Sequence, residues 1–214
     1  LGFIYKLALS YKPMIISTGM CDMVDVEEAV NACLAAGNNK VVLLQCGTMY
    51  PVPNELANLR VIQSLARRFN CPVGFSDHTL GQVAAITAVG QGATVFEKHF
   101  TLEKKSAGPD HFYALEPNEL NSYISVIRQA HEALGFGEKQ MLPNERKLGR
   151  REGLYLTRSM AKGEIITATD IVCKRPAVGL RARYASAVIG VTLAKAMEKD
   201  EPLNWDALNF GGLQ

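Results

Sequence analysis

The sequence predicts an α/β fold in which a parallel sheet wrapped by helices is followed by a separate, small β-rich domain. Over residues 1–136, short apolar runs alternate with helical patterns in units of about 20–30 residues, which is typical of a parallel sheet. After residue 137 the chain becomes polar and charged, and short β-like segments follow. We therefore expect a first domain over residues 1–136, a linker over 137–151 and a second domain over 152–214.

The elements of the first domain follow from local signals. A helix at residues 25–36 has Asp25 and Glu28 at capping-box spacing and ends at Gly37. Residues 41–46 are almost continuously apolar, as expected of a strand covered on both faces. By the same reasoning the predicted strands span 14–17, 41–46, 72–75 and 93–99, and the predicted helices span 3–9, 25–36, 55–69, 80–91 and 116–134.

Four such βα units cannot close a barrel, which takes eight over about 250 residues. We expect these units to be the second half of a TIM (β/α)8 barrel whose other half precedes Leu1. A flavodoxin-like open sheet of four strands is the alternative. In the second domain we expect strands at 154–156, 164–166 and 191–196, and single helical turns at 170–172 and 185–189.

Composition narrows the class of protein. The 214 residues are 48% hydrophobic and 21% charged with a net charge of +2, typical of a globular chain without the basic excess of a nucleic-acid binder. No apolar run approaches the roughly 20 residues that a membrane helix needs, and no signal peptide is evident. For this reason we expect no membrane partner. The five cysteines are scattered without CxxC spacing, so we expect reduced thiols in a cytoplasmic protein.

Two histidines follow the third and fourth predicted strands. Alternate side chains of a strand share a face, so Ser76 should point with His78, and Glu97 with His99. Asp77 has the opposite parity, and we expect it to orient a neighbouring loop. If both strands line one barrel, the two imidazoles converge at its mouth, where they can bind a divalent metal. A single histidine at a strand end more often makes a structural hydrogen bond.

Several short motifs stand in a fixed order. They are KPMIISTGM at residues 12–20, QCGTMYP at 45–51, FSDHT at 75–79, EKHF at 97–100 and GPDH at 108–111. In these motifs the chain resembles the sialic acid synthase family. Its tail, with Lys174-Arg175-Pro176, resembles the antifreeze-like (SAF) domain of that family. The resemblance covers essentially the whole chain.

The resemblance implies an enzyme that condenses phosphoenolpyruvate with an N-acylated mannosamine-type amino sugar and releases phosphate. The product is a nonulosonic (sialic-type) acid for surface-glycan biosynthesis. It also implies a TIM barrel that binds a divalent metal, usually Mn²⁺, through His78 and His99. Two imidazoles suit Mn, Fe, Co or Zn, so the ligands alone do not select the metal.

The resemblance also assigns substrate contacts. Ser17 and Ser76 match family positions that donate hydrogen bonds to phosphoenolpyruvate, and Thr48, where some relatives carry Asn, shares the inward parity of Tyr50. Tyr50 and Asp110 match residues that contact the sugar. An acceptor-only carboxylate suits the hydroxyls of a polyol.

Arg175 matches an arginine that reaches from the SAF domain of one subunit into the barrel of the other, which implies a domain-swapped homodimer. A guanidinium suits an N-acyl carbonyl or a hydroxyl, and an interdomain salt bridge is the alternative. The basic residues that the family places in its N-terminal half are not in this chain. We therefore expect that the chain alone is not a competent enzyme.

For several other side chains the sequence leaves alternative interpretations open. His111 lines the sugar pocket or ties down a loop, and Phe112 and Tyr113 wall the sugar site or pack. Glu97 shares the inward face of His99, and we expect it to support the metal ligands or to form a barrel-core ion pair, with a general base as the alternative. His131 should face solvent. Two other functions stay open for the whole chain: a non-catalytic carbohydrate-binding or scaffold protein, and a different metal-dependent aldolase on the same barrel.

Overall fold

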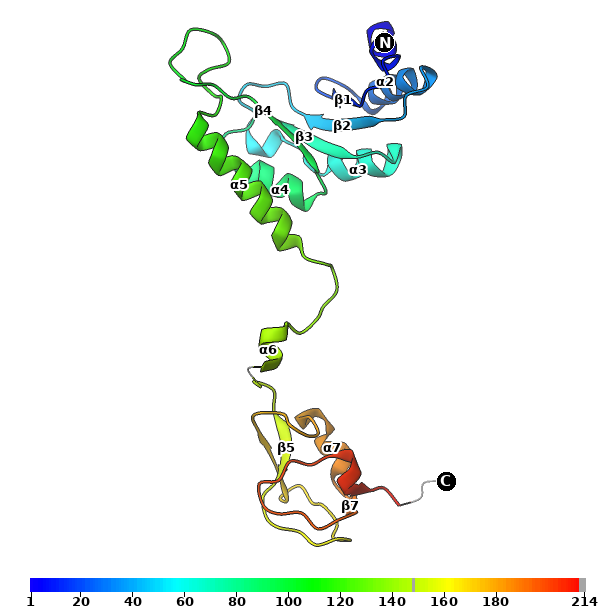
Figure 1. Cartoon of the computed structure of the whole chain (residues 1–214), viewed down its shortest axis with the longest axis vertical. Coiled ribbons are helices and arrows are strands. Elements are labelled where there is room, and N and C mark those ends of the chain that lie inside the picture. The colour runs from blue at the N-terminus through cyan, green and yellow to red at the C-terminus, as the bar shows by residue number, and fades with distance from the viewer. Residues whose placement is uncertain (148, 212–214) are drawn as a thin grey trace. The chain divides into compact units, whose positions relative to one another are not determined.

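The computed structural model describes residues 1–147 and 149–211. The chain divides into two compact units, Leu1–Gly137 and Glu138–Gln214 (Figure 1). Residue 148 of the predicted linker and residues 212–214 of the predicted second domain lie outside the described residues. None of the helices seen in the described ranges is both long and apolar enough to cross a membrane.

The first unit is built on a four-stranded parallel sheet. Its strands are β1 (Met14–Ser17), β2 (Val41–Cys46), β3 (Val73–Asp77) and β4 (Val95–Lys98). They are ordered β1-β2-β3-β4, so each strand pairs with the next one in the sequence. A barrel wall has this sequential order, whereas a doubly wound sheet reverses its order at a switch point. The predicted half-barrel is therefore confirmed, and the flavodoxin-like alternative is wrong.

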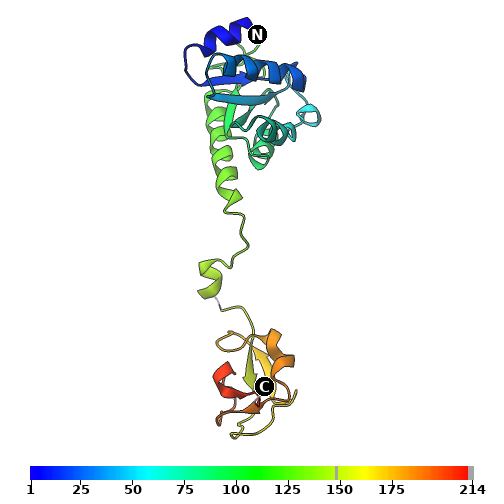
Figure 2. The same cartoon turned by 90° about the vertical axis from the view of Figure 1, so that its right-hand side faces the viewer.

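Helices connect these strands as the sequence predicts, but their first residues differ from the predicted ones. They are α1 (Gly2–Ala8), α2 (Met23–Ala35), α3 (Val61–Phe69), α4 (Val83–Gly90) and the long α5 (Pro117–Leu134), with a 3₁₀ turn η1 (Asn54–Leu56) (Figures 1 and 2). The capping box of α2 joins Asp22 to Asp25 rather than Asp25 to Glu28, so this helix begins earlier. The helix predicted at 55–69 is split because Asn58 adopts a left-handed conformation.

The helices pack on one face of the sheet. Leu43 and Phe75 on the strands, with Ile62 and Leu65 on α3, are almost completely buried in one apolar core. The alternate strand positions share the opposite face by parity. That face holds a close approach at Gly74, where a Cβ atom would overlap the carbonyl oxygen of Val95 and the side chain of Leu44.

The second unit is smaller and its strands are short. Its elements are α6 (Pro143–Lys147), β5 (Gly153–Leu156), β6 (Ile171–Lys174), η2 (Ala182–Tyr184), α7 (Ala185–Val188), β7 (Thr192–Leu193), η3 (Trp205–Ala207) and β8 (Leu208–Asn209). β5 pairs antiparallel with β6, and β7 with β8. Leu154, Leu156, Ile166, Leu193 and Leu203 form the centre of a separate apolar core.

Three predictions for this unit need correction. Residues 170–172 do not form a helical turn, because residues 171–174 pair as β6 with β5. Residues 164–166 make only an isolated bridge between Ile165 and Thr192. The strand predicted at 191–196 is reduced to the two residues of β7. The turn predicted at 185–189 is confirmed as α7.

Candidate active site

The two histidines lie side by side at the carboxyl ends of neighbouring strands. His78 follows β3 and His99 follows β4, and the register pairs Ser76 with Glu97 and Asp77 with Lys98 immediately before them. The centroids of the two imidazole rings are 5.1 Å apart, with an interplanar angle of 78°. Strand parity thus brings the two rings together, as the sequence predicts.

The tautomer of His78 is set by the backbone. Its Nδ1 lies 2.6 Å from the carbonyl oxygen of Gly47, at the end of β2. A carbonyl only accepts hydrogen bonds, so in the neutral ring Nδ1 carries the proton and Nε2 keeps the lone pair. The side chain is largely buried, which holds the ring in this orientation.

The tautomer of His99 is set by a tyrosine and an aspartate. The Tyr113 hydroxyl donates to Oδ1 of Asp110 at 3.0 Å and lies 2.9 Å from Nδ1 of His99. Because its single proton is used on Asp110, the hydroxyl accepts from Nδ1 of His99, and Nε2 is again the lone-pair nitrogen. Burial, together with the adjacent Asp110 carboxylate, raises the pKa of Tyr113 to about 12, so this hydroxyl stays protonated near neutral pH.

Sequence reasoning missed this role of Tyr113, which it weighed only as a wall of the sugar site or as packing. The side chain is 4% exposed, and it reaches His99 from the loop that follows the GPDH motif. Periodicity gives no signal for a contact made by a loop. The one available signal is the position of Tyr113, three residues after Asp110.

The pair of histidines fits a divalent metal with two protein ligands. Two imidazoles bound at right angles around one ion, with bonds of about 2.1 Å, place their ring centroids roughly 4.5–5 Å apart, close to the observed separation. Metal-ligating histidines commonly donate their other nitrogen to a carbonyl or a carboxylate-linked group, as both rings do here. Within residues 1–147 and 149–211, no group of three or more His, Cys, Asp or Glu is arranged to hold a metal ion.

Tyr50 forms an aromatic wall beside the two imidazoles. Its ring centroid is 4.4 Å from that of His78, 5.8 Å from that of His99 and 5.6 Å from that of Tyr113. About half of the Tyr50 side chain is exposed, so one part of the ring packs while the rest stays accessible. The predicted sugar contacts Tyr50 and Asp110 thus both lie next to the histidine pair.

The three predicted hydroxyl donors differ in their surroundings. Ser17 and Thr48 are exposed, Ser17 at the end of β1 and Thr48 just beyond β2. The Thr48 methyl group lies against Gly19, where a Cβ atom would overlap it. Ser76, by contrast, is almost completely buried, and its hydroxyl donates to Oε1 of Glu97 at 2.6 Å.

Glu97 and His111 each make a defined side-chain contact. Glu97 accepts a hydrogen bond from Ser76, and among the described residues no ion pair of Glu97 is found. His111 Nδ1 lies 2.6 Å from the Thr101 hydroxyl, which ties down the loop. His131 on α5 is exposed, as predicted.

Arg175 belongs to the second unit. Its side chain is largely exposed, and its Nε lies 3.6 Å from Oε1 of Glu152. It lines a hollow of about 370 Å³ whose other lining residues include Arg150, Arg151, Arg181 and Arg183. Within the described part of the unit, Arg175 is the one arginine of this group found in an ion pair.

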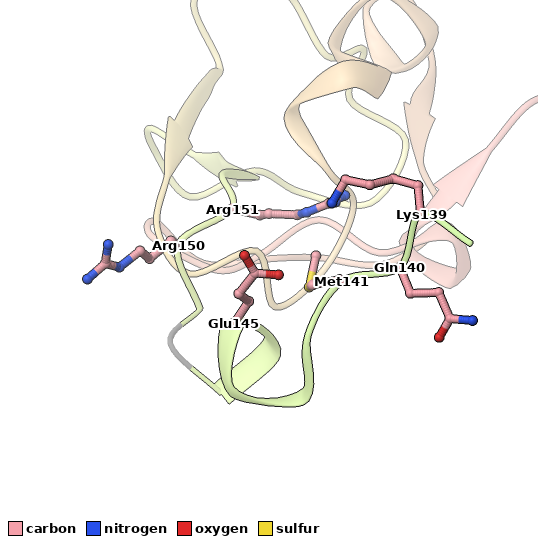
Figure 3. A pocket seen from close by; sticks show the side chains of 6 residues that line it. All are labelled: Lys139, Gln140, Met141, Glu145, Arg150 and Arg151. Atoms are coloured by element: carbon pink, nitrogen blue, oxygen red, sulfur yellow. The ribbon is translucent and has the colours of Figure 1, made fainter. Parts of the chain in front are cut away.

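A second hollow of about 400 Å³ lies next to α6. Its lining residues are Lys139, Gln140, Met141, Glu145, Arg150 and Arg151 (Figure 3). In Figure 3 the Arg150 side chain points away from that of Arg151, while the Glu145 carboxylate points toward the centre of the hollow. Both arginines are exposed, as expected of a solvated charge cluster.

Comparison with known proteins gives two family matches along the chain. The model of the NeuB family matches residues 1–139, and that of the SAF domain matches residues 151–209. The first match includes His78, His99 and the other predicted site residues of the first unit, and the second includes Arg175.

Individual relatives agree with these matches. An uncharacterised protein of Methanocaldococcus jannaschii is 40% identical over 95% of this chain, and N,N'-diacetyllegionaminic acid synthase of Legionella pneumophila is 39% identical over 91%. The chain spans only 61% and 56% of the lengths of these two proteins. The crystal structure of a putative spore coat polysaccharide biosynthesis protein E from Chromobacterium violaceum superposes with a TM-score of 0.74 and 27% identity, over 97% of this chain and 64% of that one.

Proposed function

Because this chain belongs to the NeuB family, we propose that the intact protein condenses phosphoenolpyruvate with an open-chain N-acylated mannosamine-type sugar. The products are a nine-carbon nonulosonic acid and phosphate. The observation that carries the proposal is the pair of imidazoles at adjacent strand ends, each with Nδ1 occupied and Nε2 left as the lone-pair nitrogen. Relatives named as synthases of such acids support the same assignment.

In the proposed reaction, C3 of phosphoenolpyruvate forms a bond to the aldehyde carbon of the sugar. Water adds at C2, and phosphate leaves with cleavage of the C–O bond. His78 and His99 would hold a divalent ion, with Mn²⁺ the first candidate, and the bound ion would supply Lewis acidity that polarises the aldehyde. The two hydrogen-bonded Nδ1 atoms keep both rings oriented for this task.

The other side chains of the first unit hold the substrates. The exposed hydroxyls of Ser17 and Thr48 donate to the phosphate and carboxylate of phosphoenolpyruvate. Ser76 joins them once a substrate oxygen replaces Glu97 as the acceptor of its hydroxyl proton. Tyr50 packs against the sugar, and the exposed Asp110 carboxylate accepts from sugar hydroxyls while it holds Tyr113.

The second unit contributes Arg175 to the site of a partner subunit in a swapped homodimer. Its exposed guanidinium is held only loosely by Glu152, which leaves donors for the N-acyl carbonyl of the sugar. The other arginines around the same hollow raise the local positive potential, which favours anionic substrates.

The test is phosphate release from phosphoenolpyruvate by the intact protein with Mn²⁺ and a series of acylated sugars. The series contains N-acetylmannosamine and 2,4-diacetamido sugars of the legionaminic and pseudaminic type. We expect turnover with at least one sugar and a loss of at least about 10²-fold in His78→Ala and His99→Ala, the size seen when one stabilising group is removed. His131→Ala, which changes an exposed histidine of α5, is the matched control.

The alternatives give different results in the same assay. An aldolase of another type would turn over pyruvate with an aldehyde and release no phosphate. A carbohydrate-binding or scaffold protein would bind sugar without turnover and would not depend on either histidine. Either result overturns the proposed synthase.

A further inference from the structure

Two polar pairs join β3 to β4 at the positions just before the histidines. On the face that carries the imidazoles, Ser76 donates to Glu97 at 2.6 Å. On the opposite face, Nζ of Lys98 lies 3.2 Å from Oδ2 of Asp77. The two strands are therefore tied on both faces of the sheet, within two residues before His78 and His99.

The outer pair is an ion pair taken out of solvent. The Asp77 and Lys98 side chains are 0% and 5% exposed. Burying two charges costs free energy unless good geometry and further hydrogen bonds compensate. An apolar pair would fill the same space without the free-energy cost of burying two charges. Stability alone therefore does not explain why this position holds an ion pair.

The oxygens of Asp77 are fully used. Oδ1 accepts from the backbone N–H and the hydroxyl of Thr79, at 2.8 and 2.7 Å. Oδ2 accepts from the hydroxyl of Tyr123 on α5 at 2.8 Å, in addition to Lys98. The carboxylate thus links the end of β3 to the long helix that packs behind it.

Lys98 completes the arrangement from the neighbouring strand. It donates to the carbonyl oxygen of Thr79 at 2.5 Å, and its Nζ lies 5.4 Å from the centroid of the Tyr123 ring. Asp77 and Thr79 are therefore both fixed, and they flank His78 in the sequence. Lys98 in turn directly precedes His99.

This arrangement also defines the register of the two strands. A slip of one strand by one residue would turn its histidine to the opposite face of the sheet, away from the other imidazole. It would also separate two buried opposite charges and leave each without its partner, whereas two apolar side chains would find new contacts. The ion pair therefore discriminates against the slipped pairing.

We propose that Asp77, Lys98 and Tyr123 are positioning residues that hold His78 and His99 side by side for metal binding. The inference rests on the proposed function, because that function gives the two imidazoles an ion to bind. None of the three side chains is placed to touch the substrates, since they lie on the face opposite the imidazoles or on α5 behind it.

The test uses Tyr123→Phe and Asp77→Asn in the intact protein. Tyr123→Phe keeps the ring and removes only the hydrogen bond to Asp77, so it serves where Asp77→Asn fails to fold. The control is Glu27→Gln, which breaks the exposed ion pair between Glu27 and Arg68 on α2 and α3. We measure the Kd for Mn²⁺ from the electron paramagnetic resonance signal of the free ion. Imidazole ¹⁵N shifts of the metal-free protein report the tautomers.

We expect a 10- to 100-fold weaker Kd for Mn²⁺ in both variants, the range typical of groups that orient metal ligands, and no change in the control. We also expect mixed imidazole tautomers in the metal-free variants, where the parent protein has Nδ1–H on both rings. Folded variants with the parent Kd and parent tautomers overturn the positioning role. A parent protein that binds no Mn²⁺ overturns the proposed metal site instead. In that case the positioning role is still decided by comparing the imidazole ¹⁵N shifts of the metal-free variants with those of the metal-free parent.

Discussion

The two units of this chain hold their proposed site residues in different ways. In the first unit, His78 and His99 follow directly from two adjacent strands of one parallel sheet, and their register is fixed on both faces. In the second unit, Arg175 lies at the end of the short strand β6, largely exposed, with one loose carboxylate contact. The two histidines therefore have fixed positions, whereas the side chain of Arg175 is free to adapt to what it contacts.

The largest expected effect comes from breaking the sheet of the first unit at Gly74. In Gly74→Ala the added Cβ would overlap the backbone of Val95, which cannot move without separating β3 from β4. We expect a loss of about 3 kcal/mol in the free energy of unfolding, at the upper end for overpacking. Urea unfolding followed by circular dichroism measures it. Gly90→Ala, where a Cβ meets no neighbour, is the control and should change the same quantity by less than about 1 kcal/mol.

The single tryptophan sharpens this comparison, because Trp205 lies in the second unit. Its fluorescence should report the same urea midpoint in Gly74→Ala as in the parent chain. A midpoint that falls together with the circular dichroism signal would show that the units do not unfold separately.

A smaller effect is expected from the buried carboxylate of the second unit. Hydrogen bonds from Thr167, and then from Arg158, lower the pKa of Asp170 to about 2. A carboxylate with a lowered pKa stabilises the fold above its ordinary value near 3.9, and that stability is lost as the pH falls from about 4 through 2. Asp170→Asn should therefore cost roughly 2 kcal/mol at pH 7 and much less at pH 2, measured by Trp205 fluorescence in urea.

Asp200→Asn is the matched control for this effect. Asp200 pairs with Lys174 on the surface of the same unit, and exposed pairs contribute little to stability. An equal loss in both variants would mean that burial of Asp170 does not matter.

The smallest expected effects concern Mn²⁺ affinity and sugar binding. They distinguish a residue of the first unit, Tyr113, from one of the second, Arg175. Tyr113→Phe removes the hydroxyl that holds His99, and we expect a Kd for Mn²⁺ weaker by about 10-fold with little change in unfolding. Arg175→Ala should leave the Mn²⁺ affinity unchanged and raise KM for the sugar, because Arg175 belongs to the other unit. Calorimetric titration with Mn²⁺ and steady-state kinetics measure the two effects. A weaker Mn²⁺ affinity in Arg175→Ala would contradict this division of roles.

The sequence predicts the first unit far better than the second. Apolar runs such as residues 41–46 bury both faces of a strand, and parity then places His78 and His99. In the second unit, pairing depends on contacts between distant segments, such as Thr192 with Asn209, and two-residue strands carry no periodicity. The turn predicted at 170–172 failed because its pairing with β5 outweighs the local preference.

Within the site, contacts made across elements escaped prediction. Parity turned Asp77 away from the imidazoles, but it did not reveal that Asp77 pairs with Lys98. A signal was present in the sequence: residues of opposite charge, Asp77 and Lys98, each stand one position before a histidine. Tyr113 gave no comparable signal, because its contact with His99 depends on the path of a loop.

The sequential order of the sheet has a practical consequence for handling this chain. β1 and β4 are the two ends of the order, so within the described residues each presents one row of backbone N–H and C=O groups without a strand partner. Such edges template the addition of further strands. Ile15 on β1 is also 58% exposed. Samples of this chain on its own are therefore expected to aggregate through strand addition at β1, and a charged substitution there, such as Ile15→Lys, should raise their solubility.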